Sequence, residues 1–188
     1  TRGGSKVRSI ISIFLIFLLL TMTFVSPSEA ATLPAISSPT AALFDLATGE
    51  VLAGVDAEAH VYPASTTKVL TALLVIELGD LADMVTISHK AEQQEGTSLY
   101  CQTGEEYPVR DLLYALLVLS ANDVAVALAE YVAGSVDEFA ELMNAKALEL
   151  GATDSNFINP SGLPDKEHYT TAKDMAKVFA AAFRIPLI

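Results

Sequence analysis

The sequence predicts an α/β protein of the α+β type, in which a strand hairpin near the start is followed by a series of helices. Two observations predict this class. Apolar residues recur through 41–46 and 51–55 on either side of a Thr-Gly turn, which is typical of a β-hairpin. Helical apolar periodicity, with capping residues, then recurs over residues 65–183. The length beyond the first thirty residues suits one domain.

Residues 1–30 have the composition of a signal peptide. Three basic residues near the start precede a largely apolar run over residues 10–25, and a Ser-Glu-Ala sequence ends at Ala30. We therefore expect cleavage before Ala31 and an exported protein that works outside the cytoplasm. The alternative is an uncleaved N-terminal anchor, but the apolar run is short for a membrane span of about 20 residues.

The first helices follow the hairpin. An apolar helix is expected from Val69 to Leu78, with Gly79 as its C-cap. A second apolar run covers Asp111 to Leu119. Asp123 is expected to cap a further helix from Val124 to Val132, which ends before a glycine. The segment between the second and third of these helices is therefore a turn.

The rest of the chain alternates loops with capped helices. Residues 86–107 lack helical periodicity and are expected to form a loop with short strands. A Ser-x-x-Glu capping box at Ser135 opens a helix that runs to Leu150. Turn dipeptides over residues 159–162 predict a loop, and Thr171 caps the last helix.

Composition narrows the range of functions. The chain has a net charge of −12, which argues against a nucleic-acid partner because such proteins need a basic surface. Cys101 is the only cysteine, so no disulfide forms within the chain, and it is expected to be a packed residue. The three histidines, His60, His89 and His168, are far apart and show no metal-ligand spacing. No nucleotide-binding loop occurs, so neither a metal nor a cofactor is expected.

Ser65 and Lys68 form the most informative pair in the sequence. They are three residues apart at the start of an apolar helix, so their side chains share one face. The positive end of the helix dipole and partial burial both disfavour the lysine ammonium. A neutral lysine can take the serine proton and activate the serine as a nucleophile. The alternative is a serine N-cap followed by a solvated lysine.

A second polar group follows in the turn after Leu119. Ser120 and Asn122 flank Ala121 there, where side chains can point outward from two helices. A hydroxyl group in this place could relay a proton, and a carboxamide could bind a substrate amide. The triplet taken alone is also compatible with an ordinary polar turn between helices.

These motifs, in this order, resemble the penicillin-recognising serine enzymes. Within that group the chain is similar to the D-alanyl-D-alanine carboxypeptidases, the low-molecular-weight penicillin-binding proteins of peptidase family S11. The resemblance runs from about Ala41 to about Phe183. Five segments carry it: Pro63-Ala64-Ser65-Thr66-Thr67-Lys68, Gly96-Thr97-Ser98-Leu99-Tyr100, Asp111-Leu112-Leu113-Tyr114, Ser120-Ala121-Asn122-Asp123 and Phe157-Ile158-Asn159-Pro160-Ser161-Gly162-Leu163.

The resemblance implies a β-lactamase/transpeptidase-like fold and a role for each candidate residue. Ser65 would attack the bond between two D-alanines of a peptidoglycan pentapeptide, with Lys68 as the base. Ser120 would pass a proton towards the leaving amine, and Asn122 would hold the substrate amide. The backbone N–H of Ser65 would form half of an oxyanion hole. β-Lactams would acylate the same serine.

One feature of the family is missing from this sequence. The family carries a Lys-Thr-Gly motif on a strand that lines the site, and no such triplet occurs here. We therefore expect residues 31–188 to be the N-terminal part of the catalytic domain, clipped before that strand. Many members also have a C-terminal membrane anchor beyond this point, so contact with a membrane surface is an expectation too.

Two rival functions follow from these departures. A class A β-lactamase would share Ser-x-x-Lys, but it usually has aspartate where Ala121 stands and carries a Glu-x-x-Leu-Asn loop, which is absent. The other rival is a fragment that binds cell-wall peptide or penicillin without turnover, because it lacks the strand.

Overall fold

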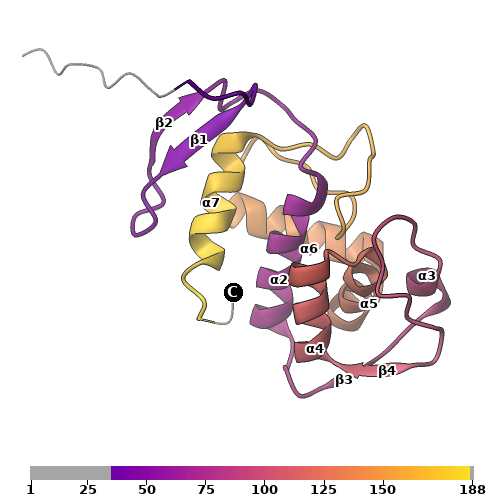
Figure 1. The fold of residues 1–188 in the computed structure, drawn as a ribbon. Coiled ribbons are helices and arrows are strands. Elements are labelled where there is room, and N and C mark those ends of the chain that lie inside the picture. The colour runs from indigo at the N-terminus through magenta and orange to yellow at the C-terminus, as the bar shows by residue number, and fades with distance from the viewer. Residues whose placement is uncertain (1–34, 187–188) are drawn as a thin grey trace, which may run out of the picture. The chain divides into compact units, whose positions relative to one another are not determined.

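The computed structural model describes residues 35–186, and these form helices with two small sheets, as Figure 1 shows. The predicted α+β class is confirmed, whereas the predicted signal peptide lies outside the described residues. In chain order the elements are β1 Ala41–Phe44, β2 Val51–Val55, the 3₁₀ helix η2 Ala64–Thr66, α2 Thr67–Leu78, β3 Met84–Thr86, α3 His89–Glu92, β4 Glu106–Pro108, α4 Val109–Tyr114, the π-helical turn η3 Ala115–Leu119, α5 Asn122–Ala133, α6 Val136–Glu149 and α7 Ala172–Ala182.

The N-terminal hairpin forms as predicted. β1 and β2 pair antiparallel with Ala41 opposite Val55, and the register shifts between Leu43 and Phe44. Gly49 makes the turn with a φ of +75°, a conformation that favours glycine. The hairpin packs against α7, which lies beside it in Figure 1.

Helix α2 lies among the other helices and carries much of the core. It contacts α5, α6, α7 and η3. Its apolar side chains are buried on more than one face, which is typical of a core helix. They include Leu70, Ala72, Leu73, Leu74 and Val75, each at most 3% exposed. The helix begins two residues before the predicted start and ends at Leu78, with Gly79 as its C-cap. The element that carries Lys68 is therefore packed against several neighbouring elements.

Asp123 does not cap the helix after the Ser-Ala-Asn turn, so that prediction is wrong. Helix α5 begins at Asn122, and its N-cap residue is Ala121, which makes no side-chain capping bond. Asp123 is instead fully buried, and its carboxylate accepts hydrogen bonds from the backbone N–H groups of Leu99 (3.0 Å) and Cys101 (3.1 Å). The side chain therefore joins the 95–101 loop to α5.

The loop between β3 and β4 contains more structure than the sequence predicted. The pair of short strands was expected, and β3 lies antiparallel to β4 with Val85 opposite Tyr107. The four-residue helix α3 was not expected. Ser88 caps it, since its Oγ accepts a hydrogen bond from the N–H of Ala91 at 3.0 Å.

Ser135 and Thr171 both cap their helices as predicted. The Ser135 hydroxyl oxygen accepts a hydrogen bond from the N–H of Glu138 at 3.1 Å and opens α6. The Thr171 hydroxyl oxygen accepts from the N–H of Asp174 at 3.0 Å and opens α7.

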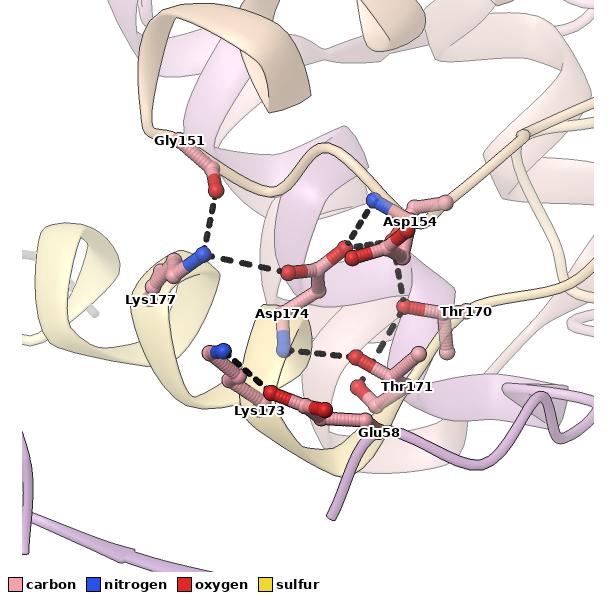
Figure 2. A network of polar contacts seen from close by, with 9 residues as sticks. Glu58, Gly151, Asp154, Thr170, Thr171, Lys173, Asp174 and Lys177 are labelled. Carbon is pink, nitrogen blue, oxygen red and sulfur yellow. Dashed lines mark hydrogen bonds and ion pairs between the residues drawn. The ribbon is translucent and has the colours of Figure 1, made fainter.

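Figure 2 shows the polar network that surrounds Asp174, which is 1% exposed. Its carboxylate accepts from the N–H of Asp154 at 2.7 Å and from the hydroxyl of Ser155 at 2.9 Å, and it forms an ion pair with Lys177 at 3.2 Å. Lys177 also donates to the carbonyl of Gly151. The network therefore anchors the start of the 151–171 segment to α7, and this segment carries the loop over residues 159–162.

Candidate active site

Ser65 lies on the 3₁₀ turn directly before α2, and it is exposed. It does not cap the helix, because the N-cap residue is Thr66, which makes no side-chain capping bond. The residue before it, Ala64, has a φ of +48°, a conformation that is costly for a residue with a side chain. The serine is therefore presented to solvent on a sharp and strained turn.

Lys68 is 2% exposed, so the alternative of a solvated lysine is wrong. Its Nζ donates to the Oγ of Ser65 at 3.2 Å and to the backbone carbonyl of Ser161 at 2.8 Å. Burial lowers the pKa of Lys68 from 10.5 to about 8. A neutral amine within hydrogen-bond reach of a serine hydroxyl is therefore accessible near physiological pH, which general-base chemistry requires.

The 159–162 loop closes over the start of α2. The hydroxyl of Thr71 donates to the carbonyl of Pro160 at 2.7 Å. Gly162 has a φ of +82°, and a Cβ built on it would lie 1.8 Å from the carbonyl oxygen of Ala64. The sequence predicted this segment as a loop but gave Ser161 and Gly162 no role. The only signal was their place in the Phe157–Leu163 segment that carries the family resemblance.

Ser120 follows the π-helical turn and adopts the left-handed conformation, with a φ of 60° and a ψ of 36°. It is half-buried. The turn lies beside the serine helix, because η3 and α5 both pack against α2. Within residues 35–186, however, no hydrogen bond joins Ser120 to Ser65 or to Lys68. The structure therefore brings two of the four predicted site residues into direct contact and places Ser120 on a neighbouring element.

Asn122 is 6% exposed and holds the loop that precedes Cys101. Its Nδ2 donates to the carbonyl of Glu95 at 2.7 Å, and its backbone N–H donates to the carbonyl of Thr97 at 2.7 Å. A Cβ on Gly96 would lie 2.8 Å from the same Nδ2. The Asn122 carboxamide, which the sequence predicted to bind a substrate amide, therefore also holds the 95–101 loop in place.

His168 is a residue that sequence reasoning missed, since the histidines were considered only as metal ligands. Its Nδ1 accepts a hydrogen bond from the N–H of Ile158 at 3.1 Å. Nε2 therefore carries the proton and donates to the hydroxyl of Thr67 at 3.1 Å. Burial lowers the pKa of His168, although Asp165 opposes this effect. The neutral ring thus links the loop before Asn159 to the residue next to Lys68.

Other reactive groups are less suited to catalysis. Cys101 is 3% exposed, and burial together with nearby carboxylates raises the pKa of its thiol to about 11, so its thiolate is disfavoured. Among residues 35–186, no group of three or more His, Cys, Asp or Glu side chains is placed to hold a metal ion. In the same range, no helix combines the length and the apolar character that a membrane crossing requires.

Comparison with known proteins identifies the family. The family model for D-alanyl-D-alanine carboxypeptidase, peptidase S11, matches residues 27–187 of the chain. The D-alanyl-D-alanine carboxypeptidase DacF of Bacillus subtilis is 39% identical over 141 residues, which cover 72% of this chain and 36% of the relative.

Two solved structures have a similar fold. The D-alanyl-D-alanine carboxypeptidase of Mycobacterium tuberculosis H37Rv is similar with a TM-score of 0.80 and 36% identity, covering 87% of this chain and 62% of that one. Penicillin binding protein 5 of Haemophilus influenzae has a TM-score of 0.75 and 33% identity, covering 81% and 47%. The chain thus spans between 36% and 62% of the length of the three proteins compared.

Proposed function

Since the chain belongs to peptidase family S11, the D-alanyl-D-alanine carboxypeptidases, we propose a function for the full-length protein that contains it. This protein is a serine-type D-Ala-D-Ala carboxypeptidase. Its substrate is the pentapeptide stem of peptidoglycan, from which it removes the terminal D-alanine. One observation carries the proposal: the Nζ of the buried Lys68 lies 3.2 Å from the Oγ of the exposed Ser65. This arrangement joins a base with a lowered pKa to an accessible nucleophile.

The reaction begins with proton transfer. Neutral Lys68 takes the hydroxyl proton of Ser65 while Oγ attacks the carbonyl carbon between the two D-alanines. The tetrahedral intermediate collapses, the C–N bond breaks, and the leaving amine takes up a proton as D-alanine departs. Water then attacks the Ser65 ester and releases the shortened peptide. The backbone N–H of Ser65 stabilises the oxyanion, a contribution that is typically about 3 kcal/mol for one such donor.

Ser120 and Asn122 complete the site in this proposal. Ser120 passes the proton towards the leaving amine, and its position on a turn next to α2 supports this role. Asn122 binds the substrate amide, which requires its carboxamide to serve the ligand as well as the Glu95 carbonyl. A β-lactam presents a strained amide in the same place, so penicillins acylate Ser65. Similarity to a penicillin binding protein supports this part of the proposal.

The proposed place of action is outside the cytoplasm, where peptidoglycan is found. Residues 1–30 act as a signal peptide, and residues 31–188 belong to the N-terminal part of the catalytic domain. N-terminal sequencing of the exported protein tests this division. The expected first residue is Ala31, and a mature protein that retains residues 2–25 would contradict it.

Labelling with a fluorescent penicillin tests the site, and it is done on the full-length gene product. Peptide mapping should place the adduct on Ser65, and Ser65→Ala should abolish both labelling and release of D-alanine from a pentapeptide. An adduct on the peptide that contains Ser120 or Cys101, with none on Ser65, would overturn the assignment.

Replacement of the lysine tests the base. Lys68→Arg should abolish acylation, because arginine stays protonated in proteins. If Lys68 provided only positive charge, arginine could replace it with a modest loss of acylation rate. Lys90→Arg is the matched control, since Lys90 is exposed on the short helix α3, and it should leave labelling unchanged.

A further inference from the structure

We propose that Asn159 is a positioning residue for the acylation step, because it builds the turn whose Ser161 carbonyl holds Lys68 against Ser65. Asn159 forms no hydrogen bond with either of the two reacting side chains. The inference rests on the proposed function, since it assumes that Lys68 is the base that activates Ser65.

The Asn159 side chain is the hub of the turn. Its Oδ1 accepts hydrogen bonds from the N–H of Gly162 at 2.8 Å, from the N–H of Leu163 at 3.2 Å, and from both the N–H (3.2 Å) and the hydroxyl (3.1 Å) of Ser161. Its Nδ2 donates to the carbonyl of Leu163 at 2.9 Å. One carboxamide thus satisfies the polar groups of three successive residues, and such side-chain bonding is how asparagine stabilises turns.

The same turn contacts the nucleophile segment at three points in a row. The Pro160 carbonyl accepts from Thr71, the Ser161 carbonyl accepts from Lys68, and Gly162 lies against the Ala64 carbonyl. This contact is the shorter of the two hydrogen bonds that the Lys68 amine makes, at 2.8 Å against 3.2 Å to Ser65. The position of Ser161 therefore decides where the lysine amine rests.

The chain on the N-terminal side of the turn is fixed without Asn159. The Asn144 side chain accepts from the N–H of Phe157 and donates to its carbonyl, both at 2.8 Å. His168 holds the N–H of Ile158. Loss of the Asn159 side chain should therefore loosen the turn itself and leave the approach to it in place.

The chemical consequence concerns the lone pair of the amine. A neutral lysine has two N–H bonds and one lone pair. When one N–H is committed to the Ser161 carbonyl, rotation about the last C–N bond is restricted, and the lone pair can face the hydroxyl of Ser65. A loosened turn would also admit water to Lys68. Burial is what lowers the pKa of Lys68, so hydration would raise it towards its ordinary value.

The experiment is a series at this position in the full-length protein, with penicillin acylation rates measured against pH. Asn159→Leu removes every polar contact at similar size. It should lower the acylation rate at neutral pH at least tenfold and move the acid limb of the profile to higher pH. Asn159→Ser keeps one acceptor, which supports such turns more weakly, so both effects should be intermediate.

Asn156→Leu is the matched control, since Asn156 belongs to the same segment and its side chain donates to the carbonyl of Glu167 at 2.7 Å, outside the turn. It should leave both rate and pH profile unchanged. The inference is overturned if Asn159→Leu keeps the wild-type pH profile of acylation. It is also overturned if the variant acylates more slowly only because less of it is folded, with the pH profile of the folded fraction unchanged. If Asn159→Leu does not fold, an unshifted profile in Asn159→Ser overturns the inference equally. Wild-type protein that is not labelled at all would instead refute the proposed function.

Discussion

Gly162 lies against Ala64 so closely that any side chain at residue 162 would collide with the backbone before the nucleophile. An added Cβ would stand 1.8 Å from the carbonyl oxygen of Ala64 and 2.9 Å from the hydroxyl oxygen of Thr67. Gly162 and Ala64 both have positive φ values, +82° and +48°. The 159–162 loop therefore packs directly against the strained turn, and Ser65 is the next residue after Ala64 in that turn.

Gly162→Ala should cost both stability and acylation. The cost should reach several kcal/mol, because the backbone must move as well as adopt an unfavourable φ. Gly104→Ala is the control, since Gly104 has a φ of +88° but nothing lies within 4 Å of an added Cβ. It should cost only about 1 kcal/mol, the strain alone. Denaturant melts of the two variants give the difference, and equal losses would show that the contact is unimportant.

Lys68 should make the folding stability of the protein vary with pH in the alkaline range. Its pKa is lowered in the folded state from 10.5 to about 8, so between these values the unfolded chain binds more protons than the folded protein. Folding stability should therefore rise with pH across this window, by up to about 3 kcal/mol.

Lys68→Met provides the comparison for this pH dependence. The variant should lack the rise in stability between pH 8 and 10.5 and should lack acylation. Urea unfolding at several pH values measures both proteins. Parallel stability curves for wild type and variant would show that the lysine is not desolvated in the folded protein.

His168 should make the stability of the folded protein depend on pH in the acid range. Burial lowers its pKa in the folded state, so below the ordinary value of about 6.5 the unfolded chain takes up the proton first. Stability should fall as pH drops through this region and should level off below the lowered pKa. His168→Gln, which can still donate to Thr67, should show a flatter profile. A wild-type curve without this acid loss would contradict a neutral buried ring.

Ser120→Ala and Asn122→Ala should both reduce turnover but differ in stability. Ser120 is half-buried and forms no side-chain hydrogen bond within residues 35–186, so its removal should change stability by less than about 0.5 kcal/mol. Asn122→Ala leaves the Glu95 carbonyl without its donor, which should cost about 1–2 kcal/mol. Thermal melts and D-alanine release separate the two effects. A Ser120 variant that melts early would show that the turn, and not a proton path, depends on this hydroxyl.

Local patterns in the sequence determined the elements and the central pair of the site. The capping residues Ser135 and Thr171 predicted the starts of two helices, because a cap is a contact between residues three apart. The pairing of Ser65 with Lys68 was predictable for the same reason, since helical geometry alone places residues i and i+3 together. These contacts need no knowledge of the rest of the chain.

Only the tertiary structure decided how that pair is held. The carbonyl that binds Lys68 comes from Ser161, 93 residues away, and every residue offers a carbonyl, so no side-chain pattern marks it. Asp123 looked like a helix cap, yet packing of the 95–101 loop gave its carboxylate other N–H groups to bind. The lowered pKa of Lys68 likewise follows from burial, which depends on elements that pack around α2. Sequence therefore specified which groups could react, and long-range packing set their protonation and orientation.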